Sequence, residues 1–174
     1  MEMDGLAKVK KPWWREWLEA LIVAIIATVI ITTFIGGSYV VQGSSMEKTL
    51  IDGDRIIVEK VSYRFGEPKR GDIIALKVPG NIFIKRIIAV GGDTVEERNG
   101  IVFVNGEQVE EEYVTNRSFF NWGPVRVPEG HVWVMGDNRP VSNDSRGTVG
   151  FVPHKDIIGR AIFRYWPLNK IGSI

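Results

Sequence analysis

The stretch TVEERNGIVFVNG, residues 94–106, decides the fold of the chain. Thr94–Arg98 and Ile101–Val104 are two short runs that read as strands with alternating faces. Asn99-Gly100 joins them, and Asn105-Gly106 follows the second run. Because Asn-Gly supplies the positive φ angles that two-residue hairpin turns need, the stretch predicts a β-meander.

Short runs rich in β-branched and aromatic residues recur along the chain, separated by Gly, Pro, Asn and Asp. Residues 113–128 interrupt the series and predict a long excursion, whose aromatic side chains either dip into lipid headgroups or pack as a flap on the core. We predict a mostly β fold, an antiparallel sheet or barrel-like domain. The further strands predicted are Ser38–Gln42, Arg55–Lys60, Asp72–Val78, Asn81–Val90, His131–Met135 and Ile157–Tyr165.

An uncharged apolar run precedes this β-rich region. It extends from Ala20 to Ile35 and, with Leu18 and the uncharged residues that follow, covers the ~20 residues of a membrane-spanning helix. A buried helix of a soluble protein is one alternative. A cleavable secretory signal is another, but its apolar region would be ~7–15 residues long. We predict one retained transmembrane helix over residues 18–37.

Charges on the two sides of this run predict its orientation. Four basic residues precede it, whereas residues 36–51 contain only Lys48, so the positive-inside rule places the N-terminus in the cytoplasm. Residues 1–17 are then cytoplasmic, and residues 38–174 form an extracytoplasmic domain of a cytoplasmic-membrane protein. The basic residues before the run are Lys8, Lys10, Lys11 and Arg15, and the aromatic ones that favour the headgroup region are Trp13, Trp14 and Trp17.

Composition excludes several function classes. The 22 basic and 21 acidic residues nearly cancel, so no strong field would recruit nucleic acid. The absence of cysteine excludes disulfides, thiolate metal sites and a cysteine nucleophile. The histidines, His131 and His154, are too few for a metal cluster and have no local triad signature. No metal or cofactor is predicted, and the oligomeric state is not indicated.

A serine or threonine activated by a lysine is the nucleophile that remains. Strand alternation in Asn81–Val90 puts Lys85 on one face with Phe83, Ile87 and Ala89, and Arg86 on the other. Arginine cannot give up its proton, whereas lowering a lysine pKa by roughly 2–3 units raises its neutral fraction at pH 7 to roughly 4–30%. The alternative is a lysine whose stem lies on apolar surface and whose head reaches water.

A second polar concentration is GDNRPVSNDSRG, residues 136–147. Asp137, Asp144, Arg139 and Arg146 could pair to fix this loop, and Ser142 could hold a lysine amine by hydrogen bonding. The alternatives are an ion-paired turn without catalytic role and a calcium loop, although the loop lacks the calcium-binding spacing.

These segments, in this order, resemble a type I signal peptidase, in its compact Gram-positive form, over essentially the whole chain. The matching segments are the N-terminal anchor, Ser45-Met46 with Thr49-Leu50, Gly71-Asp72-Ile73-Ile74, Phe83-Ile84-Lys85-Arg86 with Gly92-Asp93, the 136–146 loop including Asn138, and Trp166-Pro167-Leu168. The resemblance implies a membrane-anchored serine endopeptidase that removes signal peptides from exported preproteins after small residues at positions −3 and −1.

Carried over by position, the resemblance makes Ser45 the nucleophile, Lys85 the general base and Ser142 the hydroxyl that orients the lysine. It places Met46, Leu50 and Ile84 around the pocket for the −1 residue. It also implies that the partners are signal peptides and membrane lipid. The chain departs from the family pattern at Lys48, where proline is usual, and at Gly43, where some members have a serine in the oxyanion hole.

Two other functions remain open from the sequence. Ser45-Met46-Glu47-Lys48 fits the S-x-x-K motif of β-lactamases and penicillin-binding proteins, but their S-D-N and K-T-G motifs are missing. An anchored β-domain that binds peptides, and in which Ser45 and Lys85 never meet, is the non-enzymatic alternative.

Overall fold

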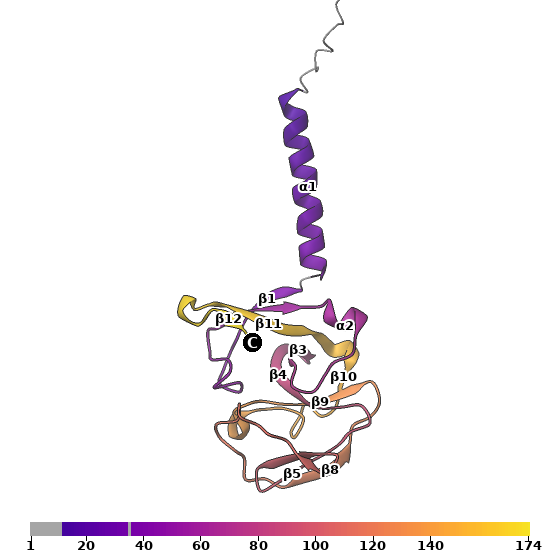
Figure 1. Ribbon diagram of the computed structural model, residues 1–174, viewed down its shortest axis with the longest axis vertical. Helices are drawn as coiled ribbons and strands as arrows, with labels where there is room; N and C mark the ends of the chain where they lie inside the picture. Colours follow the sequence, from indigo (N-terminus) through magenta and orange to yellow (C-terminus); the bar gives the residue numbers. More distant parts are fainter. Residues whose placement is uncertain (1–11, 35) are drawn as a thin grey trace, which may run out of the picture. The chain divides into compact units, whose positions relative to one another are not determined.

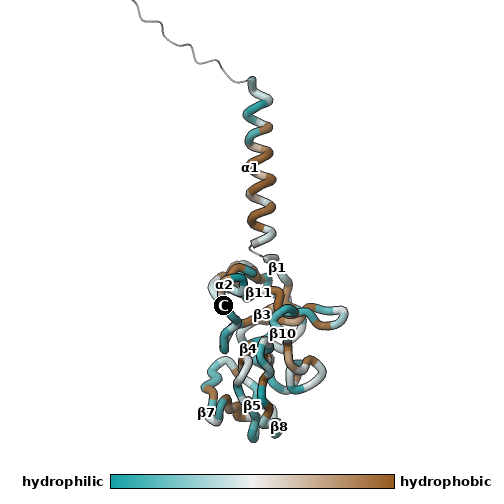
Figure 2. Tube along the Cα trace, turned by 90° about the vertical axis from the view of Figure 1, so that its right-hand side faces the viewer, coloured by the Kyte–Doolittle hydropathy of each residue, from teal (hydrophilic) through white to brown (hydrophobic). Residues whose placement is uncertain are grey.

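The computed structural model describes residues 12–34 and 36–174, which fall into two compact units, one ending at Thr33 and one comprising Phe34–Ile174. The helix α1 (Trp13–Phe34) occupies most of the described part of the first unit and ends one residue beyond it (Figure 1). Figure 2 colours most of the helix as hydrophobic, and its side chains in the described part are exposed. By length and composition α1 can cross a membrane. It begins five residues before Leu18, the predicted start, because the tryptophan-rich segment is helical too. Lys8, Lys10 and Lys11 lie outside the described residues.

The second unit is built from antiparallel strands, which confirms the mostly β prediction. Of the predicted strands, Asn81–Val90, Thr94–Arg98, Ile101–Val104 and His131–Met135 have the predicted bounds. The strands are β1 (Gly37–Val40), β2 (Arg55–Glu59), β3 (Ile73–Val78), β4 (Asn81–Val90), β5 (Thr94–Arg98), β6 (Ile101–Val104), β7 (Glu107–Gln108), β8 (Trp122–Arg126), β9 (His131–Met135), β10 (Val152–Pro153), β11 (Ile157–Trp166) and β12 (Gly172–Ser173). The helical turns are α2 (Ser62–Phe65), Arg139–Val141, His154–Asp156 and Leu168–Lys170.

Two sheets form within the described residues. The larger has the strand order β1-β2-β11-β3-β4-β9-β10, with β12 paired to β11, and the smaller has the order β7-β6-β5-β8. Figure 1 shows β5 and β8 of the smaller sheet apart from β1, β11 and β12 of the larger one. β4 lies inside the larger sheet, and the chain passes directly from it into β5 of the smaller one. The two sheets are therefore joined through the strand that carries Lys85.

The predicted meander is confirmed down to its turns. Asn99 and Gly100 have φ angles of 50° and 77°, and Asn105 and Gly106 have 55° and 82°. Both pairs occupy the left-handed region that a two-residue hairpin turn requires. Gly100 has a second reason to lack a side chain, because a Cβ there would collide with the carbonyl oxygen of Ser118.

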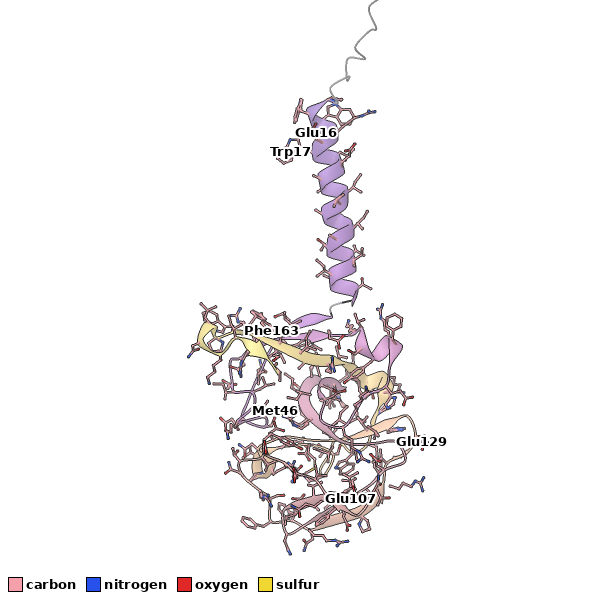
Figure 3. All side chains as sticks on the ribbon, in the orientation of Figure 1. Glu16, Trp17, Met46, Glu107, Glu129 and Phe163 are labelled. Atoms are coloured by element: carbon pink, nitrogen blue, oxygen red, sulfur yellow. The ribbon has the colours of Figure 1, made fainter. Side chains whose placement is uncertain are left out.

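The buried apolar side chains of the domain form separate clusters. Figure 3 draws the side chains on the ribbon and labels Met46, a member of one cluster. Met46 is 1% exposed and packs in a cluster with Leu50 and residues of β2 and β3. Ile88 and Ala89 both belong to the cluster between the two sheets. The prediction that Ala89 shares the face of Lys85 is therefore wrong, because the pairing of β4 with β9 shifts register between Ile87 and Ala89 and breaks the alternation.

The excursion at residues 113–128 contains a strand that the sequence pattern does not indicate. β8 pairs with β5, and Trp122 at its start stacks on Trp133 with ring centroids 4.0 Å apart. Phe119 and Phe120 are 93% and 71% exposed. Part of the excursion is thus a flap on the core, while its tip presents aromatic rings to the surroundings.

Candidate active site

Ser45 lies in a turn that connects β1 to β2. The backbone N–H of Glu47 donates to the carbonyl oxygen of Ser44 at 3.2 Å, and the N–H of Leu50 donates to that of Met46 at 2.9 Å. At the start of the turn Gly43 has a φ of 81°, and its N–H donates to Asp52 Oδ1 at 2.7 Å. These bonds hold Ser45 half-buried at the edge of a pocket.

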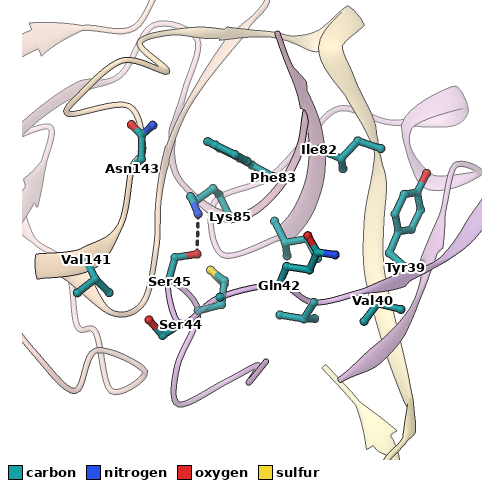
Figure 4. A pocket seen from close by; sticks show the side chains of 14 residues that line it. Tyr39, Val40, Gln42, Ser44, Ser45, Ile82, Phe83, Lys85, Val141 and Asn143 are labelled. Atoms are coloured by element: carbon teal, nitrogen blue, oxygen red, sulfur yellow. Dashed lines mark hydrogen bonds between the residues drawn. The ribbon is translucent and has the colours of Figure 1, made fainter. Parts of the chain in front are cut away.

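Lys85 reaches Ser45 from β4. Its Nζ lies 2.7 Å from Ser45 Oγ, a hydrogen-bonding distance, although forty residues separate the two in sequence (Figure 4). The side chain is 4% exposed, and the ring of Phe83 lies 5.1 Å from Nζ. The fold therefore brings together a hydroxyl and an amine that can exchange a proton.

Burial lowers the pKa of Lys85 from 10.5 to about 8, and the negative charges of Asp144 and Asp137 oppose this shift. With a pKa of about 8, roughly one lysine in ten is neutral at pH 7, compared with well under one in a thousand at the ordinary value. Desolvation thus supplies a free amine that can act as a base near neutral pH.

Arg86, the next residue of β4, has a different environment. Its Nε and Nη2 donate to the two oxygens of Asp137 at 2.9 and 2.8 Å, and the hydroxyl of Thr49 donates to the same carboxylate at 2.5 Å. Tyr113 covers the guanidinium at 3.9 Å. Lys85 forms no ion pair within the described part of the chain, so the charge of Arg86 is compensated and that of Lys85 is not.

The polar loop at residues 136–146 packs against the Ser45 turn. Asp144 and Arg146 pair with each other at 2.9 Å. Asp137 pairs with Arg86 rather than with an arginine of the loop, and Arg139, which is 2% exposed, pairs with Glu111 of the excursion at 2.5 Å. The loop is thus fixed mainly by partners on other segments, because it forms ion pairs with both β4 and the excursion.

Ser142 lies in the middle of this loop in sequence. Its Oγ and Asp144 Oδ2 each accept a hydrogen bond from the backbone N–H of Gly136 at 3.1 Å. Among the hydrogen bonds of residues 12–34 and 36–174, none joins Ser142 to Lys85. A Cβ at Gly136 would collide with both Ser142 Oγ and the carbonyl oxygen of Ser45, so the close packing of loop and turn requires glycine there.

A pocket of about 370 Å³ opens beside Ser45 and Lys85 (Figure 4). Met46 and Ile84, two of the residues predicted to surround it, do line it, whereas Leu50 is fully buried in the core beside Met46 and does not. The part of β4 that lines the pocket pairs with β3 on one side, and its pairing with β9 starts only at Arg86. The pocket therefore borders an open strand edge. Its other lining residues are Tyr39–Ser44, Ile82, Phe83, Val141 and Asn143.

Lys48, the other lysine near Ser45 in sequence, is exposed. It does not line the pocket, and no side-chain hydrogen bond or ion pair joins it to another of the described residues. The histidines also lie apart from Ser45: His131 Nδ1 is bonded to the carbonyl oxygen of Glu129, and His154 follows Pro153 in a helical turn.

Several residues that build the site carry no sequence signal of their own. Glu111 and Asn116 lie in the excursion, where no periodicity marks a buried position. Thr49 and Asn143 are common surface residue types, and only the fold shows that one binds Asp137 and the other lines the pocket.

Known proteins resemble this chain over most of its length. The profile of a family described as signal peptidase, peptidase S26, matches residues 14–166. A probable signal peptidase I-1 from Synechocystis sp. is 42% identical over 178 residues, covering 95% of this chain and 90% of the relative. A signal peptidase I from Bacillus licheniformis is 39% identical, covering 93% of this chain and 94% of the relative. A crystal structure of a signal peptidase I from Enterococcus faecalis V583 is 34% identical, with a TM-score of 0.48, and covers 54% of this chain and 96% of that chain.

Proposed function

The chain belongs to the S26 family of signal peptidases, and from the contact between Ser45 and Lys85 we propose that it is a membrane-anchored serine endopeptidase acting on preproteins. Ser45 is the nucleophile and Lys85 the general base. The observation that carries this assignment is the 2.7 Å distance from Lys85 Nζ to Ser45 Oγ. The burial that lowers the pKa of this lysine to about 8 supports it.

The reaction proceeds in two halves. Neutral Lys85 takes the proton of the Ser45 hydroxyl as Oγ attacks the scissile carbonyl carbon, and an oxyanion forms on the carbonyl oxygen. The protonated lysine then gives its proton to the leaving amine, the peptide C–N bond breaks, and an ester links Ser45 to the signal peptide. Lys85, neutral again, takes a proton from a water molecule as its oxygen attacks the ester carbon. The ester C–O bond then breaks, Lys85 returns the proton to Ser45 Oγ, and the signal peptide leaves with a new carboxyl group, which ionises in water.

The loop that contains Ser142 supports this pair. Through its bond to the backbone of Gly136, Ser142 fixes the loop against the Ser45 turn. The family resemblance implies that the Ser142 hydroxyl orients Lys85. We propose that Ser142 supports Lys85 through the position of this loop. Asp137 and Arg139 hold the same loop to β4 and the excursion through their ion pairs, and Asp144 and Arg146 pair with each other inside the loop.

The substrate binds as an extended strand. The open edge of β4 at Ile82–Ile84 provides main-chain donors and acceptors beside the pocket, which is the geometry of strand addition. Met46 and Ile84 line the same pocket as Ser45, so the substrate residue at −1 has to be small. Side chains alternate along an extended strand, so the substrate residue at −3 points to the same side as the residue at −1. These features support cleavage after small residues at −3 and −1.

The apolar helix α1 anchors the enzyme in the cytoplasmic membrane, with residues 1–17 in the cytoplasm and residues 38–174 outside. The excess of basic residues before the helix supports this orientation. Added protease should digest the domain in intact protoplasts. Protection that is lost only on lysis would show that the orientation is inverted.

The function is tested with the full chain in detergent. The protein should cut a preprotein, and N-terminal sequencing of the product should place the cut after a small residue. A serine-directed acylating probe should label the wild type and the Ser44→Ala variant but not Ser45→Ala. If Ser45→Ala still cleaves the preprotein, Ser45 is not the nucleophile. If the wild type binds the preprotein without cleaving it, the domain is a peptide-binding module.

A further inference from the structure

Asn138 contacts the turn that carries Ser45 without touching the reacting atoms. Its backbone N–H donates to the carbonyl oxygen of Ser45 at 3.0 Å, and its side-chain Nδ2 donates to the carbonyl oxygen of Ser44 at 3.2 Å. The residue is 6% exposed. Both carbonyl groups next to the nucleophile are therefore held by one residue of the 136–146 loop.

The bond to Ser44 also sets the direction of a backbone donor. In a trans peptide the C=O and the following N–H point in opposite directions, so a fixed Ser44 carbonyl fixes the N–H of Ser45 on the opposite side. This N–H has no acceptor among the residues that the structure describes, whereas the N–H of Gly43 is already bonded to Asp52. The Ser45 N–H is thus free to bind a substrate oxygen.

Two further residues fix the amide of Asn138 itself. Its Nδ2 also donates to Glu47 Oε2 at 3.4 Å, and its Oδ1 accepts from Asn116 Nδ2 at 3.4 Å. Ser44 O and Glu47 Oε2 can only accept, so the NH2 group has to face them, and each of its two hydrogens has a partner. The amide group matches this site in a way that a carboxylate or an apolar side chain cannot.

We propose that Asn138 is a positioning residue for the reaction: by holding the Ser44 carbonyl, it aims the N–H of Ser45 at the oxyanion of the tetrahedral intermediate. The oxyanion carries more charge than the ground-state carbonyl, so a correctly aimed donor lowers the barrier more than it strengthens substrate binding. This role rests on the proposed function, because it requires an acyl transfer at Ser45.

The Glu47 N–H also donates to the Ser44 carbonyl, so the peptide keeps one restraint when Asn138 is changed. The expected loss is therefore smaller than the ~10²–10³ that removal of an oxyanion donor costs. Asn138→Leu has a similar shape and no donor, and it should lower kcat about tenfold while KM changes less than twofold. If Asn138 had only a structural role, Asn138→Leu would lower the fraction of active enzyme. The remaining active enzyme would still bind the transition state as tightly as the wild type does.

The test uses full-length protein in detergent and a signal-sequence peptide with Ala at −1. The kcat and KM are measured, together with the inhibition constant of the matching peptide aldehyde, whose adduct with Ser45 is tetrahedral. Asn138→Leu should weaken aldehyde binding about tenfold, in step with kcat. Asn121→Leu, at an exposed asparagine of the excursion, is the matched control and should leave both constants unchanged.

Glu47→Ala keeps the proposal testable if Asn138→Leu does not fold, because Glu47 is exposed. It should lower kcat and weaken aldehyde binding about two- to threefold, since one restraint on the amide is lost. An unchanged kcat in a folded Asn138→Leu variant, an unchanged kcat in Glu47→Ala, or a rise in KM alone would overturn the positioning role. If Ser45→Ala retains activity, the proposed function fails, whatever the Asn138 variants do.

Discussion

The turn that carries Ser45 and the strand that carries Lys85 each contain a lysine, and they place it in opposite environments. Lys48 lies three residues after Ser45 and is exposed. Lys85 lies forty residues away in sequence, is 4% exposed and has its Nζ 2.7 Å from Ser45 Oγ. The comparison teaches that closeness to the nucleophile in sequence does not identify the lysine that can act as its general base. At Lys85 the strand provides the desolvation that lowers the pKa and frees the amine.

The comparison makes its largest prediction for activity. Lys85→Arg keeps the positive charge but cannot accept the proton of Ser45, so we expect it to lower the cleavage rate by about 10²–10⁴, as does Lys85→Ala. Lys48→Ala should retain most of the activity. The rate of peptide cleavage is compared among the wild type and those variants whose thermal stability equals that of the wild type. An inactive Lys48→Ala with an active Lys85→Ala would reverse the assignment and favour the S-x-x-K mechanism.

The same comparison predicts an effect on stability. The pKa of Lys85 falls from 10.5 to about 8 on folding, so below pH 8 the folded state bears the full cost of the buried charge, roughly 3 kcal/mol as an upper limit. Lys85→Met removes this cost and should raise the free energy of unfolding at pH 7 by about 1–3 kcal/mol. Between pH 8 and 10.5 the wild type binds fewer protons when folded than when unfolded, so its stability rises and the advantage of Lys85→Met should disappear.

Denaturant unfolding in detergent at pH 7 and pH 10 measures this difference. Lys48→Met is the control on the exposed turn and should change stability by less than about 0.5 kcal/mol at both pH values. A Lys85→Met variant that is less stable than the wild type at pH 7 would mean that Lys85 stabilises the fold. Burial of its charge would then not lower the free energy of unfolding.

How much of this could be predicted from the sequence depends on the range of the interactions. The meander and β4 were predictable, because strand alternation and Asn-Gly turns are local signals. The match of Ser45 to Lys85 came from the order of family segments and not from spacing. The pairing of Arg139 with Glu111 and the burial of Leu50 away from the pocket were not predictable, since each depends on how the excursion and the turn pack in three dimensions.

The pocket beside Ser45 and Lys85 predicts a limit on the size of the substrate residue at −1. Because Met46 and Ile84 line it, a peptide with Phe at −1 should be cleaved about 5- to 150-fold more slowly than one with Ala, which corresponds to an overpacking cost of about 1–3 kcal/mol. Met46→Ala should narrow that ratio by opening space. The ratio of kcat/KM for the two peptides is measured, and equal values for Ala and Phe would remove the pocket assignment.

The environment of Lys85 also predicts the pH dependence. The neutral fraction of a group with a pKa of about 8 rises about tenfold between pH 7 and pH 9, and kcat/KM should rise with it along a single acid limb. His131→Ala and His154→Ala should leave the limb in place. A limb centred near the ordinary histidine pKa of ~6.5 that disappears in one of these variants would make an imidazole the base.

The smallest effect is expected for Lys48→Pro, which introduces the residue that the family resemblance implies at this position and tests whether the exposed turn contributes only its shape. The side chain of Lys48 is exposed and forms no side-chain hydrogen bond or ion pair with another described residue. Its backbone N–H donates no hydrogen bond to another described residue either. Proline therefore removes neither a contact nor a donor that the turn uses. We expect kcat/KM within about twofold of the wild type and a change in the free energy of unfolding below about 0.5 kcal/mol. Lys48→Ala, measured beside it, separates loss of the charge from the change of backbone. If both variants lost activity to the same extent, the charge of Lys48 would matter, and the exposed turn would supply more than the position of Ser45.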